Sequence, residues 1–240
     1  MAHASITRWA VAACFLLAAL FPSRTPAAEN TPAPFSYAWK IVFRGEEIGH
    51  ALSRFSYRDS GGELYLVEAG TREFSTGFAG MAISFSQETS VVWDQSGLME
   101  TYVSRSAVGG RKTEGRAERR ADGAVSWKLI SEGEVKERLF SPEEFDYTDG
   151  DRFLTRLGPG TEPRTFRILS LGRGKVVSIT YRFVGREIIE IGDTRIEASR
   201  VAMEGPGVDG TLSIDDLGIA LGFTMEMFFG DFSFIPTGRQ

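Results

Sequence analysis

The stretch SYAWKIVFRGEEIG, residues 36–49, decides the fold, because it contains a complete strand and the turn that follows it. Every second residue of its first part is aromatic or aliphatic: Tyr37, Trp39, Ile41 and Phe43. The residues between them are mostly polar or small, and a period of two predicts a β-strand with one buried face. Arg44 and Gly45 then interrupt the alternation, which indicates a tight hairpin turn.

The same alternation recurs along the chain. The other strand-like runs are ELYLVEA, MAISFSQ, SVVWD, LMETYVS, AVSWKLI, EVKERLF, RTFRILSL, KVVSITYRFVG, RIEASRVAM, GTLSID and IALGFTMEMFF. Turns rich in Gly and Asp separate them, such as DSGG at 59–62 and DQSG at 94–97. The pattern predicts an all-β fold with a large, curved antiparallel sheet, a half-barrel or open barrel, and a β-sandwich is the second alternative.

One segment has a different pattern. Between Ser141 and Leu157 the alternation stops, and Ser141 is a favourable helix N-cap with Pro142 in the first turn. We therefore expect one or two short helices near residues 141–157.

Two pairs of phrases raise the question of internal duplication. FRGEEIG (43–49) is similar to FVGREII (183–189), and WDQSGL (93–98) is similar to IDDLGI (214–219). The simpler interpretation is a strand, a tight turn and a second strand in each case. The alternative is that residues 29–240, expected as one β-rich domain, consist of two similar halves, about 29–140 and 160–240.

The N-terminal residues 1–28 are typical of an export signal. Arg8 precedes the apolar run Trp9–Phe21, and small residues follow near a cleavage point before Glu29. The run is too short to span a membrane comfortably, so we expect a periplasmic or secreted protein that does not span the membrane. A lipid anchor at Cys14 is the weaker alternative, because the apolar run continues past it.

The composition limits the chemistry of the mature chain. Without Cys14 no cysteine remains, and His50 is the one histidine outside the signal. No Gly-x-Ser-x-Gly motif is present, so we predict a protein without a cofactor, and a non-catalytic role over an enzymatic one. The alternative is a hydrolase that uses His50 or paired carboxylates. The acid pairs Glu143–Glu144 and Asp215–Asp216 are adjacent in sequence, so their side chains point apart.

Metal and nucleic-acid sites have weak signals. No metal is predicted, although Asp146, Asp149 and Asp151 in DYTDGD form a candidate calcium site. Because Arg8 and Arg24 lie in the signal, the mature chain keeps 25 of the 27 basic residues against 32 acidic ones, a net charge of −7. This balance argues against nucleic-acid binding.

One basic stretch, RSAVGGRKTEGRAERR at 105–120, is the exception to the acidic composition. It is interpreted either as a solvated hairpin or as a contact for an anionic envelope surface or partner. The candidate contact residues are Arg111, Lys112, Arg116, Arg119 and Arg120.

Three segments resemble a known group of exported bacterial proteins. They are WKIVFRGEEIGHALSRFSY (39–57), WDQSGLMETYVSR (93–105), and EIIEIGDTRIEASRVAM with GTLSIDDLGIALGF (187–223). In turn positions and alternation they are similar to domain-of-unknown-function family 3108 and to related modules found beside transglutaminase-like domains. The resemblance implies a β-rich envelope protein with no established activity, and it carries over no catalytic residue.

The abundance of aromatic side chains suggests a role in binding. The chain has 18 phenylalanines, several of them in the tail LGFTMEMFFGDFSF. A large core would use them, but a curled sheet can also present an apolar concavity to a lipid, an acyl chain or an envelope protein. We predict the latter, with Trp39, Trp93, Phe223 and Phe228 as the lining. A structural or assembly module of the envelope is the remaining alternative.

Overall fold

The computed structural model describes residues 31–78, 81–206, 208–227 and 230–240, and Ala33–Gln240 forms the unit discussed below. The predicted export signal and Cys14 lie outside the described residues.

The first half of this unit contains eight strands in sequence order. They are β1 (Phe35–Phe43), β2 (Glu46–Ser60), β3 (Glu63–Phe78), β4 (Met81–Trp93), β5 (Met99–Val108), β6 (Arg111–Arg119), β7 (Val125–Ser131) and β8 (Glu134–Phe140). The second half contains β9 (Tyr147–Thr148), the 3-10 helix η1 (Phe153–Arg156), β10 (Arg164–Ser170), β11 (Lys175–Ile191), β12 (Thr194–Gly205), β13 (Val208–Ile214), β14 (Ala220–Met227) and β15 (Gly230–Arg239).

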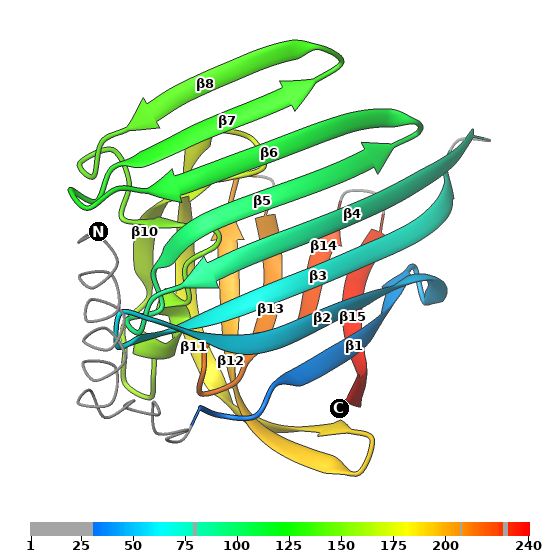
Figure 1. Ribbon diagram of the computed structural model, residues 1–240. Coiled ribbons are helices and arrows are strands. Elements are labelled where there is room, and N and C mark those ends of the chain that lie inside the picture. Colours follow the sequence, from blue (N-terminus) through cyan, green and yellow to red (C-terminus); the bar gives the residue numbers. More distant parts are fainter. Residues whose placement is uncertain (1–30, 79–80, 207, 228–229) are drawn as a thin grey trace, which may run out of the picture. The chain divides into compact units, whose positions relative to one another are not determined.

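The described strands form one sheet in the order β8-β7-β6-β5-β4-β3-β2-β1-β15-β14-β13-β12-β11-β10-β9. The first and last strands, β1 and β15, therefore pair in its middle, and consecutive hairpins lead outward from them on both sides. Among the described pairs, β9–β10 is parallel and the others are antiparallel. Figure 1 shows β2 to β7 crossing in front of the strands from β10 to β14. The predicted all-β fold with a large curved antiparallel sheet is confirmed.

The segment 141–157, expected to contain one or two short helices, contains one, the 3-10 helix η1, and is otherwise mostly irregular. Ser141 begins a single turn in which its N–H donates to Glu144 Oε1 (3.0 Å), and η1 is the one helical element among the described residues. Aspartate side chains explain this, because Asp146 and Asp151 accept hydrogen bonds from the backbone N–H groups of other segments. Such bonds favour turns over a continuous helix.

The two similar phrases at 43–49 and 183–189 have different structures. Arg44 and Gly45 both have positive φ angles (52° and 82°), as a two-residue hairpin turn of type I′ requires, so the turn prediction is confirmed there. The second phrase lies inside the long strand β11, where a β-bulge falls between Phe183 and Gly185. The prediction of a turn at 183–189 was therefore wrong, because one extra residue is absorbed without ending the strand.

The bulge lets one strand serve two hydrophobic clusters. Before it, Ile179 packs in the cluster beneath η1, and after it the odd-numbered Ile191 packs in the larger cluster. An inserted residue turns all later side chains of a strand to the opposite face. On β10, the successive residues Ile168 and Leu169 also belong to different clusters, so this part of the sheet is buried on both faces.

The larger cluster joins the two halves of the sheet. Trp127 on β7 donates its indole N–H to the carbonyl oxygen of Leu171, just after β10, at 2.6 Å. Gly174, with φ of 59°, lies under the same ring, and an added Cβ would be 2.5 Å from it. We call the face of β1–β7 that carries Trp127 and the buried Ile41 the inner face, and the name includes the face of β11–β15 that continues it through the strand register.

Candidate ligand-binding site

A row of apolar residues crosses ten strands on the inner face. Residues directly opposite each other in antiparallel strands share a face, so the row follows from the strand register. Its members, from β5 to β11, are Val108, Phe85, Phe74, Gly49, Ile41, Phe234, Phe223, Leu212, Val201 and Phe183. We call it the apolar row.

Gly49 is the one member of the apolar row without a side chain, and atoms of Glu73 and Phe74 occupy the space that a side chain would need. A Cβ at this position would lie 2.0 Å from the carbonyl oxygen of Glu73 and 2.5 Å from Cα of Phe74. The close approach of β3 to β2 therefore requires glycine, and Phe74 occupies the space beside it.

Five phenylalanines gather around the middle of the row, and we call them the aromatic cluster: Phe74, Phe85, Phe223, Phe232 and Phe234. Phe74 stacks on Phe85 with ring centroids 4.7 Å apart and meets Phe232 edge-on at 5.5 Å. Phe234 continues the contacts to Phe232 at 5.5 Å and to Phe223 at 6.2 Å. All five rings are half-buried, so the cluster presents apolar surface to solvent.

A belt of small and polar residues separates the aromatic cluster from Trp93 and Trp127 of the core. It consists of two cross-strand rows on the inner face, which we call the polar belt: Ser53, Gly70, Thr89, Ser104 and Gly115, and beside them Ala51, Arg72, Gln87, Ser106, Thr113 and Ser131. Ser53 donates to Glu68 Oε1 at 2.6 Å.

Arg72 is the cation of the polar belt. Its guanidinium lies 5.9 Å from the centre of the Phe234 ring, and Nη1 donates to Gln87 Oε1 at a long 3.5 Å. Within the part of the chain that the structure describes, Arg72 forms no ion pair with a carboxylate. A half-buried positive charge thus adjoins the aromatic cluster with only weak polar contacts.

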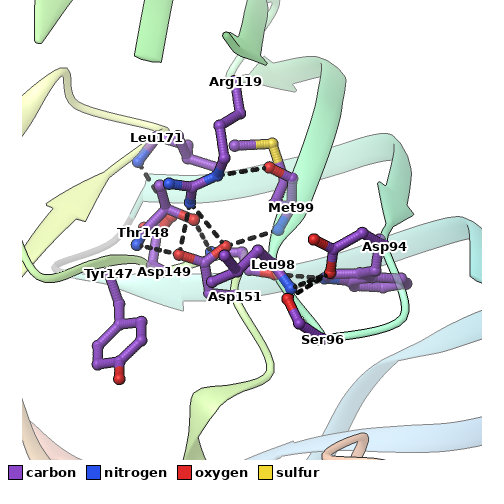
Figure 2. A network of polar contacts seen from close by, with 12 residues as sticks. Asp94, Ser96, Leu98, Met99, Arg119, Tyr147, Thr148, Asp149, Asp151 and Leu171 are labelled. Atoms are coloured by element: carbon purple, nitrogen blue, oxygen red, sulfur yellow. Dashed lines mark hydrogen bonds and ion pairs between the residues drawn. The ribbon is translucent and has the colours of Figure 1, made fainter. Parts of the chain in front are cut away.

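Figure 2 shows a second inner-face arginine in a different setting. Arg119 Nη2 binds both carboxylate oxygens of Asp151, at 3.0 and 2.8 Å, and its Nε donates to the Met99 carbonyl oxygen at 3.0 Å. Asp151 also accepts the backbone N–H groups of Met99 and Thr148, each at 2.6 Å. Asp151 is buried and each of its carboxylate oxygens accepts two hydrogen bonds, so this network stabilises the fold.

The three aspartates of the candidate calcium site have separate partners. Asp151 is bound by Arg119, and Asp149 Oδ1 accepts the N–H of Leu171 at 3.0 Å. Asp146 pairs with Arg167 at 2.8 Å, and that guanidinium lowers the pKa of the Asp146 carboxyl. Over residues 31–78, 81–206, 208–227 and 230–240, no three His, Cys, Asp or Glu side chains are grouped to hold a metal ion.

The basic stretch does not form a uniformly positive surface. Arg119 is bound inside the fold, which corrects its assignment as a surface contact, and Arg120 is exposed at the β6–β7 turn. Arg116 pairs with Glu114 at 2.6 Å, and Arg111 pairs with Glu132 at 3.4 Å.

A hollow of about 770 Å³ lies beside this stretch on the outer face of β3–β7. Arg111, Lys112 and Arg105 line it together with four carboxylates: Glu73, Glu88, Glu114 and Glu132. Charges of both signs are mixed there, so the hollow has no strong preference for an anion.

The four residues predicted to line the ligand site do not share one environment. Trp39 and Trp93 are buried, and their indole N–H groups donate to the carbonyl oxygens of Leu221 (2.6 Å) and Gly150 (2.5 Å). They are core residues, which corrects their assignment to a ligand-facing surface. Phe223 belongs to the aromatic cluster, and Phe228 lies outside the described residues.

The sequence interpretation missed Phe74, Phe85 and Arg72. They occur in EAGTREFSTGF and MAISFSQ, runs whose alternation gives their face but not their neighbours. The signal that would have found them is the cross-strand register, which depends on pairing between strands.

The residues of the hydrolase alternative are dispersed. His50 is exposed on β2, opposite Lys40 and Glu73. Glu143 is exposed near the Ser141 turn, and the Ser141 hydroxyl lowers its pKa. Glu144 binds Arg138 and the N–H of Ser141.

The loops at 93–98 and 214–219, in contrast to the other similar phrases, share one structure. Asp94 accepts the N–H of Leu98 through its side chain, and Asp215 accepts that of Ile219, each at 2.8 Å. Both loops contact Arg152, whose Nη1 donates to the Leu217 carbonyl oxygen at 2.8 Å.

Asp215 is the buried member of this loop pair, and Asp216 beside it is exposed. Burial raises the pKa of the Asp215 carboxyl, and the hydrogen bonds from Ile219 and Leu217 and the charge of Arg152 partly oppose this. Asp215 therefore anchors its own loop and is not paired with a second carboxylate for hydrolysis.

One comparison with a known protein supports the fold. No family model matches this chain, and no curated protein sequence matches it. Among the described residues, no helix is long and apolar enough to cross a membrane. A DUF1089 family protein from Pseudomonas aeruginosa is 13% identical, over 81% of this chain and 91% of that one, with a TM-score of 0.31.

A second solved structure is much closer in shape. The beta-barrel-like protein of domain of unknown function DUF1849 from Brucella abortus matches with a TM-score of 0.61 and 12% identity, over 88% of this chain and 98% of that one. The specific resemblance to family 3108 has no support from these matches. The coarser expectation holds: this chain has a β fold similar to that of a beta-barrel-like domain of unknown function.

Proposed function

We propose that this protein is a non-catalytic binding protein of the bacterial envelope that holds a single hydrocarbon chain against the aromatic cluster. The observation that carries the proposal is the partial exposure of five contacting, half-buried phenylalanines on the inner face. Their edges and faces match an alkyl chain, which has no polar atom to satisfy.

The binding free energy would come from the burial of apolar area. Removing apolar surface from water contributes about 25 cal/mol per Å², so covering roughly 300 Å² would contribute about 7 kcal/mol before the cost of immobilising the ligand. A C12 chain can supply an area of this order, and a net free energy of about 6 kcal/mol, after a loss of about 1 kcal/mol, corresponds to a Kd of roughly 40 μM.

Two further features favour binding over hydrolysis. The aromatic cluster adjoins Arg72, which supplies charge without a nucleophile, whereas His50 is exposed on β2. The signal-like residues 1–28 support the envelope location, where lipids are the abundant apolar ligands.

The proposal is tested by titrating the full chain with dodecan-1-ol in a calorimeter, because an uncharged head group isolates the contribution of the alkyl chain. We expect micromolar binding by the wild type and a loss of at least about tenfold in the double variant Phe74→Ala/Phe85→Ala. Phe166→Ala is the matched control, since Phe166 is a half-buried phenylalanine that packs against the hydrophobic cluster beneath η1. Equal weakening by the control, or no binding by the wild type, would contradict the proposal.

A further inference from the structure

We infer that the natural ligand of the aromatic cluster is a fatty acid, and that Arg72 binds its carboxylate. This inference rests on the proposed function, and it adds the chemical class of the head group. It is carried by the position of Arg72 and by the partners that this side chain has.

The position of Arg72 fits an amphiphile with one charged end. Arg72 on β3 is opposite Gln87 on β4. This pair lies two residues along each strand from the stacked pair Phe74 and Phe85, on the same face of the sheet. The guanidinium lies above the ring of Phe234 in the same cluster. A head group at Arg72 would therefore leave the attached chain in contact with the phenylalanines.

The partners of Arg72 leave room for an anion. Removing a cation from water is unfavourable unless an opposite charge or strong hydrogen bonds replace the lost solvation. The long hydrogen bond to Gln87 and the contact with Phe234 supply little of this. A carboxylate can accept two parallel N–H bonds from a guanidinium, and the amide nitrogen of Gln87 can donate a further one after rotation.

The charge near Arg72 favours a carboxylate over a phosphate monoester. Arg72 is the one cation of the polar belt, and Glu68 lies on the same face of β3, next to Ser53. A phosphate monoester carries up to two negative charges near neutral pH, of which one arginine would neutralise one. A carboxylate carries a single charge, which the site balances.

The test compares dodecanoate, dodecan-1-ol and dodecyl phosphate by calorimetry on the full chain. We expect the wild type to bind dodecanoate about tenfold or more tightly than the alcohol, and more tightly than the phosphate. Arg72→Gln should weaken dodecanoate binding by about 10–100-fold and change dodecan-1-ol binding by less than about twofold. Arg54→Gln, at an exposed position of β2, is the matched control and should leave all three affinities unchanged.

Each contrary outcome has a distinct meaning. Equal affinity of the wild type for dodecanoate and dodecan-1-ol would overturn the role of Arg72 and leave the proposed function intact. The same follows if Arg72→Gln weakens both ligands alike. Tighter binding of dodecyl phosphate would overturn the assignment to a fatty acid. If neither the acid nor the alcohol binds, the proposed function fails as well.

Discussion

Arg119 and Arg72 lie on the same face of the same sheet, yet their surroundings differ completely. Arg119 is bound to both oxygens of Asp151, and its side chain is 11% exposed. Arg72 has Gln87 at 3.5 Å and no carboxylate partner among the described residues. The difference distinguishes an arginine that stabilises the fold from one that is available to a ligand.

Removing the carboxylate that pairs with Arg119 should have the largest effect on the free energy of unfolding. Asp151→Asn leaves a buried guanidinium without a counter-charge and turns an amide toward backbone N–H groups, so we expect a loss of about 3–5 kcal/mol of unfolding free energy. Urea unfolding followed by circular dichroism measures it. Asp146→Asn, which breaks the exposed pair with Arg167, is the control and should cost less than about 1 kcal/mol. Equal losses would contradict the structural role of Asp151.

A second variant tests the close strand approach in the apolar row. Gly49→Ala places a methyl group against the backbone of Glu73 and Phe74, so we expect a loss of about 1–3 kcal/mol in the same urea assay. Gly77→Ala is the control on β3, because a Cβ at that position meets open space. A loss in Gly77→Ala as large as in Gly49→Ala would show that the strand register at the row is wrong.

The two arginines should also differ in their own contributions to stability. Arg119→Gln should cost about 3 kcal/mol, because it leaves Asp151 buried without its partner. Arg72→Gln should change the free energy of unfolding by less than about 0.5 kcal/mol, since it removes no ion pair. Thermal and urea unfolding of both variants measure this. A large loss in Arg72→Gln would identify Arg72 as a structural residue and contradict its availability to a ligand.

The smallest expected effect concerns the loop that contains Asp215. Burial raises its pKa in the folded state, so the folded chain keeps this proton at a higher pH than the unfolded chain does. The difference between the unfolding free energy of the wild type and that of Asp215→Asn should therefore decrease as the pH rises above the ordinary pKa range of aspartate. Asp216→Asn controls for the loss of a negative charge from the same loop. An increase of this difference with pH would contradict the sign.

The sequence predicted the sheet because alternation is a local property. Tyr37 and Ile41 are buried as their spacing requires, and the turn at Gly45 has the positive φ that its type needs. The bulge after Phe183 could not be predicted, since the similar phrase beside Gly45 contains the same residue types in a turn. Pairing with a neighbouring strand decides between the two structures.

The candidate site was predicted less well, for the same physical reason. Trp39 and Phe74 both lie on alternating strands, yet Trp39 is buried in the core and Phe74 is only half-buried. Which aromatic side chain faces a ligand depends on what packs over it from strands far away in the sequence. The role of the aspartates of DYTDGD could not be predicted either, because the partners of Asp151 and Asp146, Arg119 and Arg167, lie outside that segment.

The most direct test of the binding account is a crystal structure of the full chain grown with dodecanoate. We predict an alkyl chain in contact with Phe74, Phe85 and Phe234, and a carboxylate within hydrogen-bonding distance of the Arg72 guanidinium. Dodecanoate bound in the outer-face hollow beside Lys112, or an aromatic cluster that stays uncovered at saturating ligand, would contradict it.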